Sequence, residues 1–365
     1  MQFTKDDVEC LYANLRLNEN IINDNVKFLM NYYRKFFELY KKDVTIQNFD
    51  EHFYSEINDK IRFFNENKTI KTFIDNEKNN VTKLKLNNIT FYCYGNELEK
   101  SKLLLKIANV MYQFYEQNKE ITIIWIPINK RKIFQSSFLN EDTLQQSVDN
   151  FEAFTVSGLT QDNHSTVIIT RQEEIIKLLF HELIHCFDAD GSNYNFDEII
   201  KEYRKKKDSR LHSYESDIFE SYTELLSSYF NMIYYLVSEN VLLTDEVLFN
   251  RLKSLILIEY FYSLNLICNL IHLNSGLDYD FFYQYGYFIG DICIYEYYYL
   301  KTIMYNNFKL KELKTKNDFS QNLKNIINLN TYDPNIARVF QYYKKTNLYN
   351  YCFVHPNLPH NFINV

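Results

Sequence analysis

One stretch decides the fold of this chain, TVIITRQEEIIKLLFHELIHCF, which covers residues 166–187. Its first part, residues 166–170, is rich in β-branched side chains and predicts a strand. From Glu173 onward the apolar residues recur at steps of three and four, which predicts a helix over residues 173–187. The stretch therefore places a strand directly before a helix, and it places the sequence HELIH inside that helix.

The pattern HExxH occupies residues 181–185 of this predicted helix. Positions four apart share a helix face, so His181 and His185 can direct both imidazoles at one metal ion. Glu182 lies about 100° around the helix from His181, where it can reach a metal-bound water without competing as a ligand. Because a chain with eight histidines would rarely produce this pattern by chance, it predicts one Zn²⁺ per chain with Glu182 as the general base.

A zinc site of this kind needs a third protein ligand, and the fourth position is left for water. The downstream sequence FESYTELL, residues 219–226, has a helical pattern with two acidic residues one turn apart. We expect Glu220 to be the third metal ligand and Glu224 to accept a hydrogen bond from a ligand imidazole. The reverse assignment, and an acidic helix face exposed to solvent, remain open alternatives.

Further candidates lie around these two helices. His212 precedes the second helix and can polarise a substrate carbonyl or stabilise an oxyanion, although its position favours a surface or core histidine. Asp188 and Asp190 follow the motif closely, where they can cap the helix end, hold a ligand histidine or stay solvated. Tyr222 and Tyr229 are possible phenol donors in a chain with 32 tyrosines.

The pattern outside the motif predicts an α+β fold, predominantly helical, with a small mixed β-sheet. Residues 1–80 have a mostly helical pattern, and the polar stretch 66–85 within and after them is interpreted as a linker. The predicted strands are 88–94, 121–128, 151–156 and 166–170, with Gly158 in a loop. The predicted helices from residue 98 onward are 98–115, 173–187, 214–237, 244–273 and 279–305. Three regions follow from this order, namely 1–80, 81–190 with the HExxH helix, and 191–365 with the third ligand.

Composition restricts the functional class. The net charge of −7 argues against a nucleic-acid binder, which needs a basic face. Six scattered cysteines without a CxxC pair are typical of reduced thiols, and the N-terminus has no apolar signal segment. The most apolar stretch, residues 252–273, includes Lys253 and Glu259 and is interpreted as a core helix, so no membrane span is expected. We therefore expect an intracellular protein.

Several motifs in order resemble those of the zinc metallopeptidases encoded by large DNA viruses. The motifs are a strand ending near a proline and basic residues, a Ser-Gly-hydroxyl segment, an Arg-x-Glu-Glu helix with HExxH, and a later Glu-Ser-aromatic-x-Glu. They correspond here to ITIIWIPINKRKI (121–133), FTVSGLTQ (154–161), the stretch 166–187 and YESDIFESYTELLSSYF (214–230). The resemblance covers residues 86–230, and NKRKIF after Ile128 departs from the Lys-Lys-Leu-Pro ending that is commoner in the family.

The resemblance implies a zincin-like metalloprotease fold of the class whose third ligand is glutamate, the gluzincins. It implies that Zn²⁺ is held by His181, His185 and Glu220, that Glu182 is the catalytic base, and that peptides or proteins are the substrates. It also implies a protein of the host cytoplasm or the virion, with other virion proteins as further partners. HELIHCFDADG (181–191) resembles the active helix of neprilysin-like peptidases as well, whose third ligand lies farther downstream.

Two other functions remain compatible with the same residues. The first is a catalytically inactive zincin fold that serves as a structural or binding protein of a viral particle; an intact HExxH with Glu182 argues against it. The second is a zinc hydrolase that cleaves a non-peptide amide, because its site chemistry would be the same. In metalloproteases of this plan, the strand before the active helix pairs with extended substrate, which points to residues 165–170.

Overall fold

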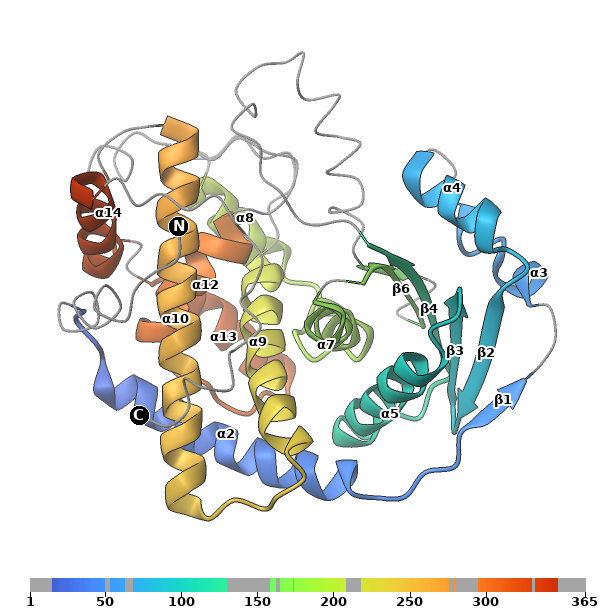
Figure 1. Cartoon of the computed structure of the whole chain (residues 1–365). Helices are drawn as coiled ribbons and strands as arrows, with labels where there is room; N and C mark the ends of the chain where they lie inside the picture. The colour runs from blue at the N-terminus through green and yellow to red at the C-terminus, as the bar shows by residue number, and fades with distance from the viewer. Residues whose placement is uncertain are drawn as a thin grey trace.

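The computed structural model describes residues 15–49, 53–62, 68–129, 158–161, 165–172, 174–207, 218–275, 279, 295–329 and 332–346. A six-stranded mixed sheet lies on one side of the molecule and a layer of helices on the other (Figure 1). The predicted class, α+β with more helix than strand and a small mixed sheet, is confirmed.

The sheet has the strand order β1-β2-β3-β4-β6-β5. Its strands are β1 (Gln47–Phe49), β2 (Val81–Leu86), β3 (Ile89–Tyr94), β4 (Ile121–Ile128), β5 (Gly158–Gln161) and β6 (Thr166–Arg171). The strands β3, β4 and β6 run parallel, whereas β1, β2 and β5 pair antiparallel with their neighbours. Parallel neighbours need a crossover, and α5 (Leu98–Phe114) supplies it between β3 and β4.

Helices cover both faces of the sheet, which explains its apolar central strands. On β4, Ile123 and Trp125 point into the large core beneath α5 and α7 (Ile175–Cys186), while Ile124 and Ile126 point into a smaller core on the opposite face. That opposite face is covered by α3 (Tyr54–Ile57) and α4 (Lys68–Glu77) (Figure 1). The alternation follows from the two-residue period of a strand.

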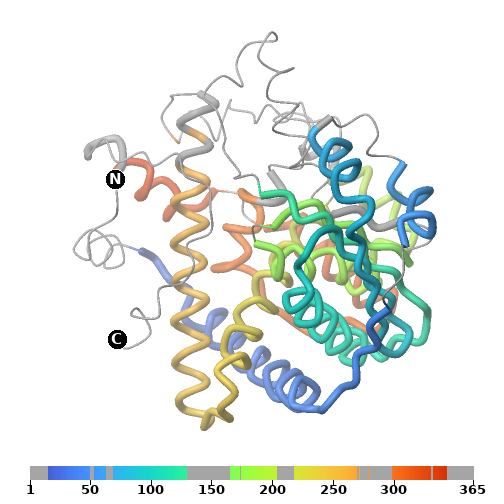
Figure 2. The backbone as a smooth tube through the Cα atoms, turned by 45° about the vertical axis from the view of Figure 1, so that its right-hand side comes forward, coloured from blue at the N-terminus to red at the C-terminus, as the bar shows by residue number. Residues whose placement is uncertain are grey.

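The helical layer joins segments from both ends of the chain. It contains α2 (Glu19–Tyr40), α8 (Asp197–Lys207), α9 (Ile218–Ser238), α10 (Asp245–Ser275), the π-helical turn η2 (Tyr295–Leu300), α12 (Lys301–Asn307), α13 (Lys316–Ile327) and α14 (Pro334–Thr346). In Figure 2 the blue α2 lies across the base of α10 and α9. Buried Asn25 of α2 donates a hydrogen bond to Phe308 O and accepts one from Leu310 N, so the first helix is fixed to the C-terminal segment.

Several predicted elements are confirmed and others are wrong. The strands predicted at 88–94 and 121–128 and the helix predicted at 98–115 are present as β3, β4 and α5. The linker interpretation of residues 66–85 is wrong, because this stretch holds α4 and most of β2. Gly158 begins β5 instead of lying in a loop.

Other predictions fall partly or wholly outside the described residues. The strand predicted at 151–156 lies there, as does much of the helix predicted at 279–305, whose described part is η2 and α12. The apolar stretch 252–273 belongs to α10, where Leu252, Leu264 and Ile267 are buried in the core. None of the helices in the described part of the chain is long and apolar enough to cross a membrane.

Candidate metal centre

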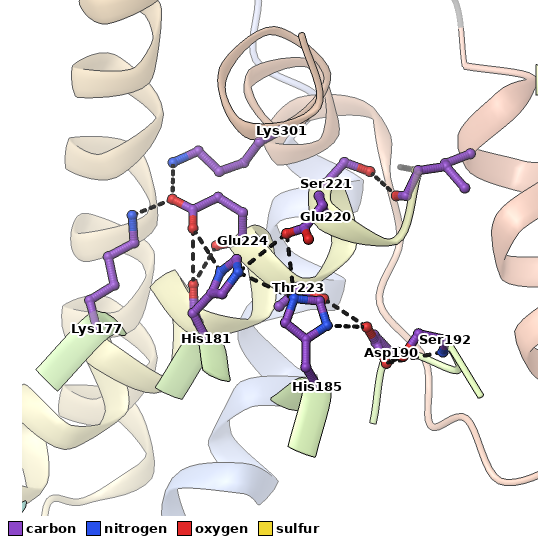
Figure 3. A network of polar contacts seen from close by, with 12 residues as sticks. Lys177, His181, His185, Asp190, Ser192, Glu220, Ser221, Thr223, Glu224 and Lys301 are labelled. Carbon is purple, nitrogen blue, oxygen red and sulfur yellow. Dashed lines mark hydrogen bonds and ion pairs between the residues drawn. The ribbon is translucent and has the colours of Figure 1, made fainter. Parts of the chain in front are cut away.

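Two packed helices carry the side chains that the sequence analysis singled out. His181, Glu182 and His185 lie on α7, which follows β6 after a short connection, and Glu220 lies in the first turn of α9. The helices α7 and α9 pack closely against each other. Residues four apart on α7 and a residue at the start of α9 thus face one another (Figure 3).

Three potential ligand atoms form a nearly equilateral triangle. His181 Nε2 lies 3.2 Å from Glu220 Oε2, His185 Nε2 lies 3.4 Å from the same oxygen, and the two Nε2 atoms are 3.3 Å apart. In a tetrahedral zinc site with bonds of about 2.0–2.1 Å, two ligand atoms lie about 3.3–3.4 Å apart. The spacing of these side chains therefore fits a zinc ion, and it leaves the fourth position open.

The proton positions of both imidazoles follow from the carboxylates behind them. His181 Nδ1 lies 3.2 Å from Glu224 Oε2, and His185 Nδ1 lies 2.6 Å from Asp190 Oδ2. A carboxylate only accepts hydrogen bonds, so each Nδ1 carries the proton. In each neutral imidazole the Nε2 atom then carries a lone pair. Both lone pairs converge on the Glu220 carboxylate, an arrangement that a cation stabilises.

Asp190 is held in place by the turn that follows α7. This residue is 1% exposed, and its Oδ1 accepts hydrogen bonds from the backbone N–H and the hydroxyl of Ser192 at 3.1 and 2.9 Å. Thr223 of α9 donates to Oδ2 at 3.3 Å. Of the two aspartates after the motif, Asp190 is thus the one that contacts His185, a predicted ligand.

Glu224 divides its two oxygens between the imidazole and two lysines, of which Lys177 is partly buried and Lys301 is buried. While Oε2 faces His181, Oε1 forms an ion pair with Lys177 and lies 3.4 Å from Lys301 Nζ. Lys301 is also 3.6 Å from Glu259 Oε1 on α10. Figure 3 shows Lys177 and Lys301 approaching the same carboxylate oxygen from different helices.

Electrostatics at the triangle favour charged side chains despite burial. Burial opposes the charge of His181, but the carboxylates of Glu220 and Glu224 outweigh it and raise the pKa of this imidazole to about 9. Burial likewise opposes ionisation of Glu220, and the two imidazoles nevertheless hold its pKa well below its usual range. Positive charge at the triangle is therefore strongly favoured.

The charge balance of this network also fits a divalent cation. The contacts above join the four carboxylates of Asp190, Glu220, Glu224 and Glu259 to the two ammonium groups of Lys177 and Lys301. With neutral imidazoles, these carboxylates outnumber the ammonium groups by two, and the buried carboxyl of Glu182 lies on the same helix. Buried charge is stable only when it is paired, so the network favours a bound cation.

The other predicted residues have varied positions. Glu182 is 6% exposed on α7 beside His181, whereas His212 lies outside the described residues. Asp188 belongs to the turn after α7, and Tyr222 and Tyr229 are buried on α9 within the large core.

Sequence reasoning missed both lysines. Lys177 was detectable, because it lies four residues before His181 on the same helix face. Lys301 lies 77 residues after Glu224, and no local pattern connects the two.

One expectation about substrate pairing is wrong. The strand before the active helix is β6, which is paired on both sides, parallel with β4 and antiparallel with β5. It has no free edge for an extended peptide. Among the residues that the structure describes, the strand at this margin of the sheet is β5, which pairs with β6 alone.

Comparison with known proteins gives one distant viral relative. Uncharacterized protein R210 of Acanthamoeba polyphaga mimivirus is 28% identical to this chain over an alignment of length 249 that covers 64% of the chain. The chain spans about 60% of the length of that relative. No family model matches the chain, and no solved structure matches it significantly.

Proposed function

We propose that this protein is a zinc-dependent metallopeptidase with a zincin-like fold. The observation that carries the proposal is the triangle of His181 Nε2, His185 Nε2 and Glu220 Oε2, with sides of 3.2–3.4 Å. The carboxylates that hold both Nδ1 protons support it, because they direct lone pairs at the centre of this triangle. His181, His185 and Glu220 would hold one Zn²⁺ per chain.

The chemistry at the open position would be amide hydrolysis. Bound zinc supplies a water of lowered pKa and polarises a carbonyl oxygen. Glu182, the residue after the first ligand, accepts the proton of the attacking water and passes it to the leaving amine. The side chains of His185 and Glu220 are 15% and 18% exposed, whereas the Glu220 Oε2 atom of the triangle is buried.

The sheet offers a place for a peptide substrate. β5 lies antiparallel to β6 at the margin of the sheet, and α7 contacts both strands. An extended peptide can pair with the backbone of β5 by hydrogen bonds, which would bring it near α7, the helix that carries HExxH. We propose peptides or proteins as substrates for this reason.

The viral setting is part of the same proposal. The mimivirus relative supports a viral origin. Action in the host cytoplasm or in the virion, on or beside other virion proteins, is consistent with this origin. A zincin fold that has become a catalytically inactive particle protein would share the fold and the setting but not the proton transfer by Glu182.

The test separates metal binding from catalysis. After reconstitution with Zn²⁺, elemental analysis should find close to one zinc per chain. Glu182→Gln should retain zinc and fold but lose roughly 10²–10⁴-fold in the cleavage rate of a peptide library. The control is Glu246→Gln, an exposed residue of α10, which should cleave like wild type. If the wild-type protein binds no zinc, the proposed metal site is contradicted. If the zinc-loaded wild-type protein cleaves the peptide library and virion proteins no faster than Glu182→Gln does, the proposed peptidase activity is contradicted.

A further inference from the structure

Lys301 is a buried lysine from a late segment of the chain that reaches the metal centre. It is the first residue of α12 and follows directly on the π-helical turn η2. The residue is 1% exposed, and its Nζ lies between Glu224 Oε1 and Glu259 Oε1, at 3.4 and 3.6 Å. Lysines are almost never fully buried unless paired, and π-helical turns occur often at functional sites.

The contacts of Glu224 form a path from Lys301 to a proposed metal ligand. Oε1 of Glu224 contacts Lys301, and Oε2 of the same carboxylate accepts from His181 Nδ1. A carboxylate is rigid and planar, so fixing one oxygen restricts where the other can lie. The ammonium group of Lys301 thus helps to set the orientation in which the Glu224 carboxylate accepts the hydrogen bond from the imidazole.

The second lysine on this carboxylate cannot replace the first. Lys177 lies one turn before His181 on α7, so it approaches Glu224 from the helix that carries the imidazole. Lys301 approaches from α12 and is linked through Glu259 to α10. Only the pair of lysines holds the carboxylate between two independent helices (Figure 3).

We propose that Lys301 is a positioning residue of the metal centre, which holds Glu224 in the orientation that directs His181 Nε2 at the metal. This inference rests on the proposed zinc site and extends it to a segment beyond residues 86–230. Without Lys301, the Glu224 carboxylate turns toward Lys177, the hydrogen bond to His181 Nδ1 weakens, and the metal is bound less tightly.

The first experiment measures Zn²⁺ affinity by competition with a chromophoric chelator. Lys301→Met removes the ammonium group and keeps the length of the side chain, and Lys301→Gln is a second variant that keeps a hydrogen-bond donor. Losses of about 10–100-fold are typical when a partner behind a metal ligand is removed, and we expect about 10-fold for Lys301→Met. Circular dichroism melting shows which variants are folded, and if Lys301→Met does not fold, the affinity of Lys301→Gln decides.

The matched control is Ile303→Ala, on the same helix and 0% exposed. It destabilises α12 by creating a cavity but touches no charge of the network. It should lower the melting temperature and leave Zn²⁺ affinity within about twofold of wild type. A loss of affinity in Ile303→Ala equal to that in the Lys301 variant would overturn the inference, because general loosening of α12 would then explain both.

A double-mutant cycle tests whether Lys301 acts through Glu224. Glu224→Gln alone should weaken Zn²⁺ binding, and adding Lys301→Met to it should weaken binding little further. The visible spectrum of the Co²⁺-loaded protein should shift in Lys301→Met and not in Ile303→Ala, because it reports the ligand field at the metal. Additive losses, or a wild-type spectrum and wild-type affinity in Lys301→Met, contradict the inference. Wild type that binds neither ion contradicts the proposed function itself.

Discussion

His181 and His185 differ in what lies behind them. Asp190, behind His185, is fixed by hydrogen bonds from Ser192 and Thr223, all of them from neutral groups. Glu224, behind His181, is held by two lysines and by a longer contact of 3.5 Å from the Ser227 hydroxyl. Each imidazole therefore has a carboxylate partner, but one partner is held by neutral donors alone and the other mainly by charge.

Substitutions of the two glutamates of α9 should differ in how strongly they weaken metal binding. Glu220→Ala removes one of three protein ligands and should nearly abolish Zn²⁺ binding. Glu224→Ala acts only through His181 and should weaken binding about 10–100-fold. Chelator competition measures both, with exposed Glu246→Ala as the control that should bind like wild type. If Glu224→Ala empties the site and Glu220→Ala does not, the two roles are reversed.

The core of the candidate site was predictable because its spacing is local. The helical period alone brings His181 and His185 to one face, and α9, which follows α8, supplies Glu220 and Glu224 one turn apart. Lys301 was not predictable, since its partner is distant in sequence and a lone lysine is most often solvated. Long-range ion pairs leave no periodic trace.

The prediction of strands from the sequence failed where polar residues interrupt the apolar pattern of a strand. β2 reads VTKLKL, and its buried positions Val81, Leu84 and Leu86 are interrupted by Thr82, Lys83 and Lys85. Lys83 is satisfied on the sheet surface by Glu56 at 2.7 Å and by the ring of Phe53. A strand next to the short edge strand β1 thus has a charged composition like that of a linker. Strongly apolar β4, which is buried on both faces, was predicted correctly.

The turn after α7 contains a glycine that α13 requires. Gly191 has φ +84°, and a Cβ there would lie 2.5 Å from Phe319 Cδ1 of α13. The neighbouring Asp190 holds His185. The packing of α13 on this turn is therefore connected to the candidate metal centre through a single residue, Asp190.

Replacing this glycine should damage both stability and metal binding. Gly95→Ala is the matched control, because Gly95 also has φ +82° but its Cβ would meet nothing closer than 3.8 Å. Left-handed backbone costs an alanine about 1–2 kcal/mol, which both variants lose. Gly191→Ala should lose roughly another 1–3 kcal/mol from overpacking, measured by urea unfolding. It should also bind Zn²⁺ more weakly, whereas equal stabilities and affinities of the two variants would contradict the packing argument.

Distant parts of the molecule meet at Asp333, directly before α14. Its Oδ1 accepts from Asn335 N at 2.7 Å and its Oδ2 from the Tyr260 hydroxyl of α10 at 3.3 Å. Asn335 in turn contacts both the backbone N–H and the carbonyl of Arg16 near the start of α2. This buried carboxyl lies where the first and last described helices join α10.

The whole protein should become less stable as the pH rises because of Asp333. Burial outweighs its hydrogen bonds and raises its pKa. Below about pH 4, near the ordinary value, the carboxyl is protonated in both states. As the pH rises through its folded pKa, the unfolded state releases the proton more readily, so stability falls. Asp333→Asn keeps the acceptor at the helix start and should remove this dependence. Urea unfolding between pH 4 and 7 should show that the free energy of unfolding of the variant exceeds that of the wild type by an amount that grows with pH. A difference that stays constant with pH would refute the prediction.

The proposed metal centre draws on α7, α9 and α12, and α12 lies far along the chain from the two histidines. The ribosome adds about 5–20 residues per second, and 77 positions separate Glu224 from Lys301. A nascent chain therefore waits about 4–15 s after making Glu224 before the last support of His181 exists. During synthesis the two imidazoles and their glutamate are exposed to the cell before they are fully oriented. The order of the elements along the chain thus makes the contact of Lys301 with Glu224 the last of these contacts that can form during synthesis.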